Sequence, residues 1–116
     1  MSNKVAVVTG GSSGIGRCCA AALAQSGCLV YELSRRDIPL KGVTHIPADV
    51  TDEASVIAAI DQILCEQGRI DIVVNCAGFG ISGAVEFTAL ADARRQFDVN
   101  FFGTVNVNKA VLPHMR

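Results

Sequence analysis

The segment that most constrains the fold is residues 5–16, where an apolar run passes through a glycine-rich turn into a second apolar segment. The run predicts a buried strand, and the segment near residues 15–26 predicts a helix. In such a turn Gly10 lets the chain leave the strand, and Gly14 lets a ligand approach the main chain. Gly16 lets the helix pack closely against the sheet.

The start of this predicted helix suits a phosphate group. Its first amides have no partner within the helix and lie at the positive end of the helix dipole, which stabilises an anion. Ser12 and Ser13 add hydroxyl donors, and Ile15 belongs to the same first turn. The alternative is that Gly10 and Gly11 mark an ordinary loop. The order of strand, glycines and apolar helix favours a site for nucleotide phosphates.

The rest of the chain alternates between strand-like and helix-like segments, as in a parallel sheet with crossover helices. Strands are predicted near residues 4–9, 28–34, 43–47 and 70–75. After the helix near 15–26, further helices are predicted near 52–67, from about Thr88 after a loop at 78–87, and from about Val99. The helix near 52–67 has Thr51 or Asp52 as its cap and Gly68 past its end. No repeat or linker interrupts the pattern, so one domain over residues 1–116 is expected.

Right-handed crossovers give the strand order 3-2-1-4, which predicts an α/β fold with a Rossmann-type, doubly wound parallel sheet. Ligands of such sheets bind outside the carboxyl ends of the strands where the order reverses, here between strands 1 and 4. Residues 10–16 and 75–78 both fall on this edge. The sequence therefore predicts that two distant motifs converge on one crevice.

The amino-acid composition limits the classes of partner that the chain is expected to bind. Half of the residues are hydrophobic and the formal net charge is −1, which is typical of a globular domain and argues against a nucleic-acid partner. No apolar run near the start suits a signal peptide or a membrane span, so we expect no membrane partner and a cytoplasmic location. The five cysteines lack metal-ligand spacing and are expected to be small, buried and reduced, with no metal. His45 and His114 have no visible partner in the sequence.

Four motifs together carry a family resemblance. Thr9 precedes a Gly-x-x-x-Gly-x-Gly turn, and the three others are Asp49-Val50, Asn75-Cys76-Ala77-Gly78 and Asp98-Val99-Asn100. With these motifs the chain resembles the short-chain dehydrogenase/reductase family over nearly its whole length, which corresponds to about the first half of a typical member. The resemblance implies an oxidoreductase that transfers a hydride between a nicotinamide cofactor and a small-molecule carbonyl/alcohol pair.

The end of the second predicted strand determines which cofactor is expected. In NAD-binding relatives an acidic residue there accepts hydrogen bonds from the ribose hydroxyls, and this position falls on Ser34. Ser34, Arg35 and Arg36 suit a 2′-phosphate, which favours NADP(H) over NAD(H). The alternative is that the two arginines form a solvated loop. Glu32 comes too early and Asp37 too late to be the acidic determinant.

Further cofactor contacts are implied by the resemblance. Asp49 is expected near the adenine ring with Val50 packed on it, although a loop or helix-capping carboxylate is an equal alternative for Asp49. Asn75, Ala77 and Gly78 are expected to order the central strand and leave room for the nicotinamide ribose. The family usually has asparagine where this chain has Cys76.

The resemblance assigns Asn100 to a proton relay, while a helix cap or kink is the alternative from its residue type. The family's catalytic serine, tyrosine and lysine have no counterpart here. The only tyrosine, Tyr31, lies in a predicted strand, and Lys109 has no partner tyrosine. Hydride transfer needs a proton donor or acceptor as well as positioning. These 116 residues are therefore expected to bind cofactor without turnover.

Three readings follow. The chain is the N-terminal part of an NADP-dependent oxidoreductase, a stand-alone nucleotide-binding module, or a subunit that a partner chain completes. The strand near 70–75 is expected to present an exposed apolar edge and to lower the stability of the chain. Apolar residues in 79–87 hint at a hydrophobic substrate, and the helix starting near Asn100 suggests a homo-oligomer.

Overall fold

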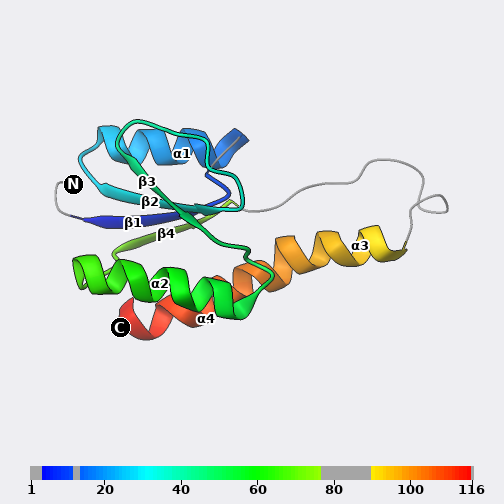
Figure 1. Ribbon diagram of the computed structural model, residues 1–116. Helices are drawn as coiled ribbons and strands as arrows, with labels where there is room; N and C mark the ends of the chain where they lie inside the picture. Colours follow the sequence, from blue (N-terminus) through cyan, green and yellow to red (C-terminus); the bar gives the residue numbers. More distant parts are fainter. Residues whose placement is uncertain (1–3, 12–13, 77–89, 116) are drawn as a thin grey trace.

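The computed structural model describes residues 4–11, 14–76 and 90–115 (Figure 1). The strands are β1 (Val5–Thr9), β2 (Leu29–Ser34), β3 (Val43–Pro47) and β4 (Ile72–Asn75). The helices are α1 (Gly14–Gln25), α2 (Glu53–Gln67), α3 (Leu90–Phe97) and α4 (Gly103–Met115), and a π-helical turn, Asp98–Phe102, joins α3 to α4. No described helix is both long enough and apolar enough to cross a membrane.

The four strands form one parallel sheet in the order β3-β2-β1-β4, which confirms the predicted order. Figure 1 shows α1 on one face of the sheet and α2 with α4 on the other, while α3 extends beyond the sheet. All five residues of β1 are buried, as expected for a strand covered on both faces. The sheet is therefore of the doubly wound, Rossmann type.

Alternate residues of β1 belong to two separate parts of the core. Val5 and Val7 pack in the cluster beneath α2 and α4, whereas Ala6 and Val8 pack in the cluster beneath α1. This alternation follows from the two-residue period of a strand. The larger cluster takes in the predicted stripe of α2, with Val56, Ile60 and Ile63 buried and Leu64 packed against it.

Local signals placed most element ends correctly. The Asp52 side chain caps α2 by accepting hydrogen bonds from the Ala54 and Ser55 amides, and Gly68 ends the helix at φ 77°. The longer helix predicted from about Val99 begins instead at Gly103, because residues 98–102 form the π-helical turn. The expected loop at 78–87 and the helix start at Thr88 lie outside the described residues.

The expectation of buried cysteines is wrong for two of the five. Cys28 is buried, Cys19 and Cys76 are partly exposed, and Cys18 and Cys65 are exposed. Cys18 lies on α1 between two buried positions, Gly16 and Ala20, so the helical period turns it outward. Cys65 similarly lies on the outer side of α2. None of these five cysteines, all within the described residues, forms a disulfide.

Candidate functional site

The turn after β1 has the backbone that its glycines predict. Gly10 has φ 67° and Gly14 has φ 57°, conformations that side-chain-bearing residues rarely adopt. The Gly10 amide donates to the Leu33 carbonyl oxygen at 2.9 Å, which ties the turn to the end of β2. Apart from its chain neighbours and the backbone of its own helix, no described atom lies within 4 Å of a Cβ built on Gly14, and Ile15 beside it is 78% exposed. The start of α1 is therefore open to a ligand.

Gly16 is needed because the helix approaches the turn closely. A Cβ at Gly16 would lie 2.2 Å from the Gly10 carbonyl oxygen and 3.1 Å from the Cys76 Cβ. The Cys76 amide also donates to Thr9 Oγ1 at 3.1 Å. Thr9 and Asn75 are register partners of β1 and β4. The two motifs thus converge at the reversal point of the strand order, as predicted, although Ser12, Ser13, Ala77 and Gly78 lie outside the described residues.

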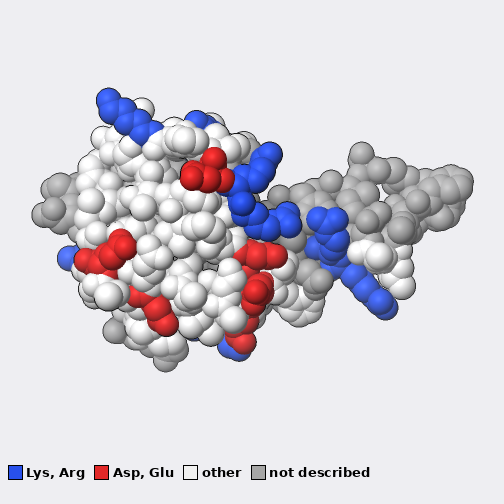
Figure 2. Space-filling view, viewed as in Figure 1, with Lys and Arg blue, Asp and Glu red and all other residues white. Residues whose placement is uncertain are grey.

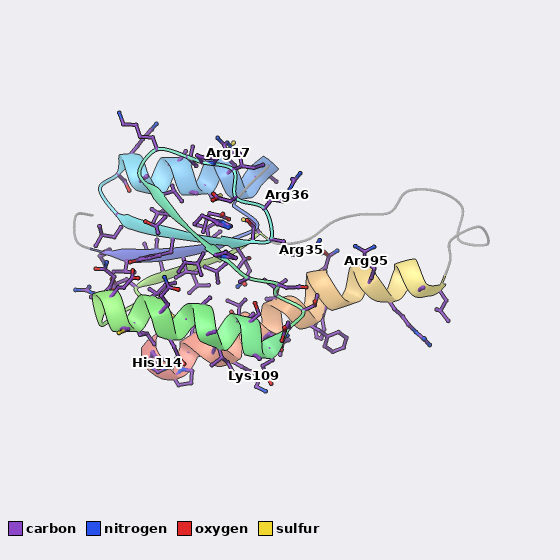
Figure 3. The ribbon with its side chains drawn as sticks, in the orientation of Figure 1. Arg17, Arg35, Arg36, Arg95, Lys109 and His114 are labelled. Atoms are coloured by element: carbon purple, nitrogen blue, oxygen red, sulfur yellow. The ribbon has the colours of Figure 1, made fainter. Side chains whose placement is uncertain are left out.

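Basic side chains follow the end of β2. Arg35 and Arg36 are exposed, and Figure 3 shows both beyond this strand end, with Arg95 farther along on α3. In the same view, Figure 2 shows basic side chains gathered in this region with acidic side chains beside them. Ser34 is half-buried, and its Oγ lies 2.9 Å from the Arg36 carbonyl oxygen and 3.0 Å from Glu32 Oε1.

Glu32 and His45 form a pair that reasoning along the sequence missed. They are register partners on β2 and β3, and His45 Nδ1 bonds to Glu32 Oε1. Glu32 is only 2% exposed. Both residues line a pocket of about 420 Å³ between the two strands and the 37–41 segment. His45 therefore has a partner after all, and only the register between parallel strands could have revealed it.

Asp49 is engaged within its own loop. Its Oδ1 accepts hydrogen bonds from the Thr51 hydroxyl at 2.6 Å and from the Thr51 amide at 3.0 Å. The hydroxyl bond holds the pKa of the Asp49 carboxyl below its ordinary value, against the opposing effect of burial, and the charge of Arg35 lowers it further. Val50 is 7% exposed and packs in the core. The loop-carboxylate alternative accounts for these Asp49 contacts.

Asn75 and Asn100 lie in different settings. Asn75 Nδ2 donates to Asn108 Oδ1 at 3.1 Å, which links the end of β4 to α4. Asn100 is exposed within the π-helical turn, and its carbonyl oxygen accepts from Thr104 Oγ1 at 3.3 Å. The π-helical turn separates α3 from α4, and Asn100 lies within it.

Tyr31 of β2 and Lys109 of α4 both have partners away from the glycine turn. The Tyr31 hydroxyl donates to Glu66 Oε1 at 2.7 Å near the end of α2, and burial raises the pKa of this phenol. Lys109 Nζ pairs with Glu53 Oε2 at 3.1 Å on the surface. Among the described residues, no group of three or more His, Cys, Asp and Glu side chains could hold a metal ion.

Comparison with known proteins agrees with this geometry. The family model described as short chain dehydrogenase matches residues 4–116. A 3-ketodihydrosphingosine reductase of Bacteroides thetaiotaomicron is 44% identical over 100% of this chain and 44% of its own length. An L-fucose dehydrogenase of Mus musculus is 36% identical over 99% of this chain and 45% of its own length. The chain belongs to the short-chain dehydrogenase/reductase family of oxidoreductases.

Solved structures share the fold as well. The ligand-free aldohexose dehydrogenase of Thermoplasma acidophilum superposes with a TM-score of 0.94 at 39% identity, over 98% of this chain and 45% of that protein. The chain therefore spans less than half the length of these relatives. Members of the family bind NAD(P), and the relatives' names describe oxidoreductases acting on a ketone, a sugar or an aldose.

Proposed function

We propose that the chain forms the cofactor-binding part of an oxidoreductase that moves a hydride between NADP(H) and a small-molecule carbonyl/alcohol pair. The observation that carries this proposal is the convergence of the glycine turn with the end of β4. An open helix start lies at the same point where the strand order reverses. When bound, the nicotinamide supplies or accepts the hydride.

The glycine turn fits a pyrophosphate because Gly10 and Gly14, whose positive φ favours glycine, place no side chain there. Main-chain amides from Ser12 to Gly16, including that of Ile15, would face the phosphates, and the hydroxyls of Ser12 and Ser13 would add donors. Asn75, Ala77 and Gly78 would border the nicotinamide ribose. Asp49 and Val50 would border the adenine, with Asp49 acting through its ordered loop rather than as a free carboxylate.

The cofactor preference rests on charge at the end of β2. Arg35 and Arg36 are exposed there, and a guanidinium can bind a phosphate through two parallel hydrogen bonds. Ser34 lies on the strand end beside them. A 2′-phosphate would gain the contacts with the two arginines, whereas a 2′-hydroxyl would not, which favours NADP(H).

Catalysis requires more than these residues offer. Asn100 is proposed as a member of a proton relay, but the 116 residues contain no Tyr-x-x-x-Lys pair that could exchange the substrate proton. We therefore expect cofactor binding without turnover from this chain by itself. The substrates named for the relatives range from a sphingoid ketone to sugars, so the proposed substrate class stays a carbonyl/alcohol pair.

An oligomer is proposed from the exposed apolar residues that follow α3. Phe101, Phe102, Val105, Leu112 and Met115 are each more than a third exposed. They belong to the π-helical turn and to α4, so they extend along one continuous segment. Exposed apolar surface of this kind marks interaction sites, and a second copy of the chain is the proposed occupant.

The experiment is a calorimetric titration with NADPH and NADH. Arg35→Ala should weaken NADPH binding by about 10- to 100-fold, the value of a charge-assisted contact, and leave NADH binding nearly unchanged. Arg69→Ala is the matched control, because Arg69 is also an exposed arginine but pairs with Asp71 before the start of β4. Equal loss of both cofactors in Arg35→Ala, or binding of neither by the wild-type chain, would contradict the proposal.

A further inference from the structure

The buried carboxylate of Glu32 is not used by the proposed function. It lies on β2 two residues before Ser34, at the carboxyl end of the strand where the cofactor ribose is expected. His45 holds one carboxylate oxygen, Oε1. The other oxygen, Oε2, is buried and has no hydrogen-bond partner in the described part of the chain. A buried, half-satisfied carboxylate is costly, so it calls for a functional explanation.

The Glu32 side chain is held firmly in this position. A Cβ built on Gly11 would lie 2.8 Å from the Glu32 Cβ and 3.3 Å from its Oε2. The glycine turn therefore closes over one side of the carboxylate, while His45 contacts it from β3. Because both neighbours belong to the packed sheet region, the carboxylate cannot swing toward solvent without disturbing them.

Glu32 Oε1 is one of two protein atoms that compete for the Ser34 proton. The Ser34 hydroxyl has one proton, and its two acceptors are Glu32 Oε1 at 3.0 Å and the Arg36 carbonyl oxygen at 2.9 Å. In either arrangement the proton points to an atom of the protein itself. Ser34 then offers lone pairs to an incoming group, which suit a ribose 2′-hydroxyl but not an ionised 2′-phosphate.

The charge of Glu32 also disfavours a 2′-phosphate at this position. The Ser34 hydroxyl contacts the Glu32 carboxylate, so a phosphate oxygen bonded to Ser34 would lie close to that carboxylate. The negative charges of the phosphate and of the carboxylate would repel one another. Besides His45, which pairs with Glu32, the charged groups near this end of the sheet are Arg35, Arg36 and Asp37 after β2, Arg17 on α1, and Asp49 after β3. Arg35 and Arg36 attract the phosphate, so Glu32 opposes them.

We propose that Glu32 is a positioning residue that restrains the NADP(H) preference, by repelling the 2′-phosphate and by offering the Ser34 proton an acceptor within the protein. The inference rests on the proposed function, because it needs a cofactor ribose at the end of β2. It makes the chain a binder of both cofactors, in which the arginines favour NADP(H) and Glu32 keeps NAD(H) competitive.

The test is the ratio of the NADH and NADPH dissociation constants in Glu32→Gln. This variant keeps the shape of the side chain and removes its charge, so the preference for NADPH should rise by about tenfold, mainly through tighter NADPH binding. Glu66→Gln is the matched control. It also removes a carboxylate bonded to a side chain of β2, but on the α2 side of the sheet, and it should leave the ratio unchanged.

Ser34→Ala provides a second readout that does not depend on the folding of Glu32→Gln. If the Ser34 proton points inward, this variant weakens NADH more than NADPH. The reverse order, or an unchanged ratio in a folded Glu32→Gln, overturns the inference while the proposed function stands. Equal weakening of both cofactors in Glu32→Gln marks a purely structural role and overturns it too. Failure of the wild-type chain to bind either cofactor overturns the proposed function and the inference together.

Discussion

Replacing Gly16 by alanine sets two effects of opposite sign against each other. Within a helix, alanine is favoured over glycine by up to about 1 kcal/mol, so helix propensity alone predicts a more stable protein. The added Cβ, however, would lie 2.2 Å from the Gly10 carbonyl oxygen and 2.8 Å from its carbonyl carbon, whereas ordinary contacts begin near 3.4 Å. Both atoms belong to the backbone, so the start of α1 and the turn must move apart.

Overpacking of this kind costs about 1–3 kcal/mol, which exceeds the gain in propensity. With the full gain in propensity subtracted, we expect Gly16→Ala to lower the free energy of unfolding by up to about 2 kcal/mol in urea titrations followed by circular dichroism, at an unchanged m-value. Ala22→Gly, at an exposed position of the same helix, measures the propensity effect separately. A Gly16→Ala protein as stable as the wild type would refute the argument from close approach.

Three further predictions concern the other side of the sheet. Asp52→Ala should cost about 1 kcal/mol in urea unfolding through loss of the α2 cap, whereas Asp61→Ala in the same helix should not. Thr51→Val should raise the pKa of Asp49 in an NMR titration. Because the Asp49 pKa is lowered in the folded chain, the Asp49 carboxylate stabilises the fold at pH values above its ordinary pKa of about 3.9, and this stabilisation is lost as the pH falls. The Thr51→Val variant loses part of this stabilisation, so its acid unfolding should begin at a higher pH than that of the wild type. Lys109→Met removes an exposed ion pair and should change stability by less than about 0.5 kcal/mol; a larger loss would show that the pair is structural.

The sheet could be predicted from sequence because its determinants are local or general. Right-handed crossovers fix the order of strands once strands and helices alternate, and β3-β2-β1-β4 is the order found. The ends of α2 were also predictable, since an aspartate cap and a glycine at positive φ each act within a few residues.

The contacts of the candidate site depend on register and helix phase, which local signals do not encode. Glu32 and His45 become partners only because β2 and β3 pair in one particular register, set by the intervening segment. The π-helical turn at 98–102 has no sequence signature, so the start of α4 was placed too early. Cys18 and Cys65 were judged by residue type, while the helical period decided their exposure.

The central position of β1 has a consequence for how the sheet opens. β1 and β2 are paired along both sides in the described sheet, whereas β3 and β4 are each paired along one. Ile72, Val73 and Val74 of β4 are also only partly buried, in contrast to every residue of β1. Amide hydrogens of β1 should therefore exchange with solvent only when the whole sheet unfolds, and those of β4 through smaller openings. The strand that leads into the glycine turn is thus among the last to be released.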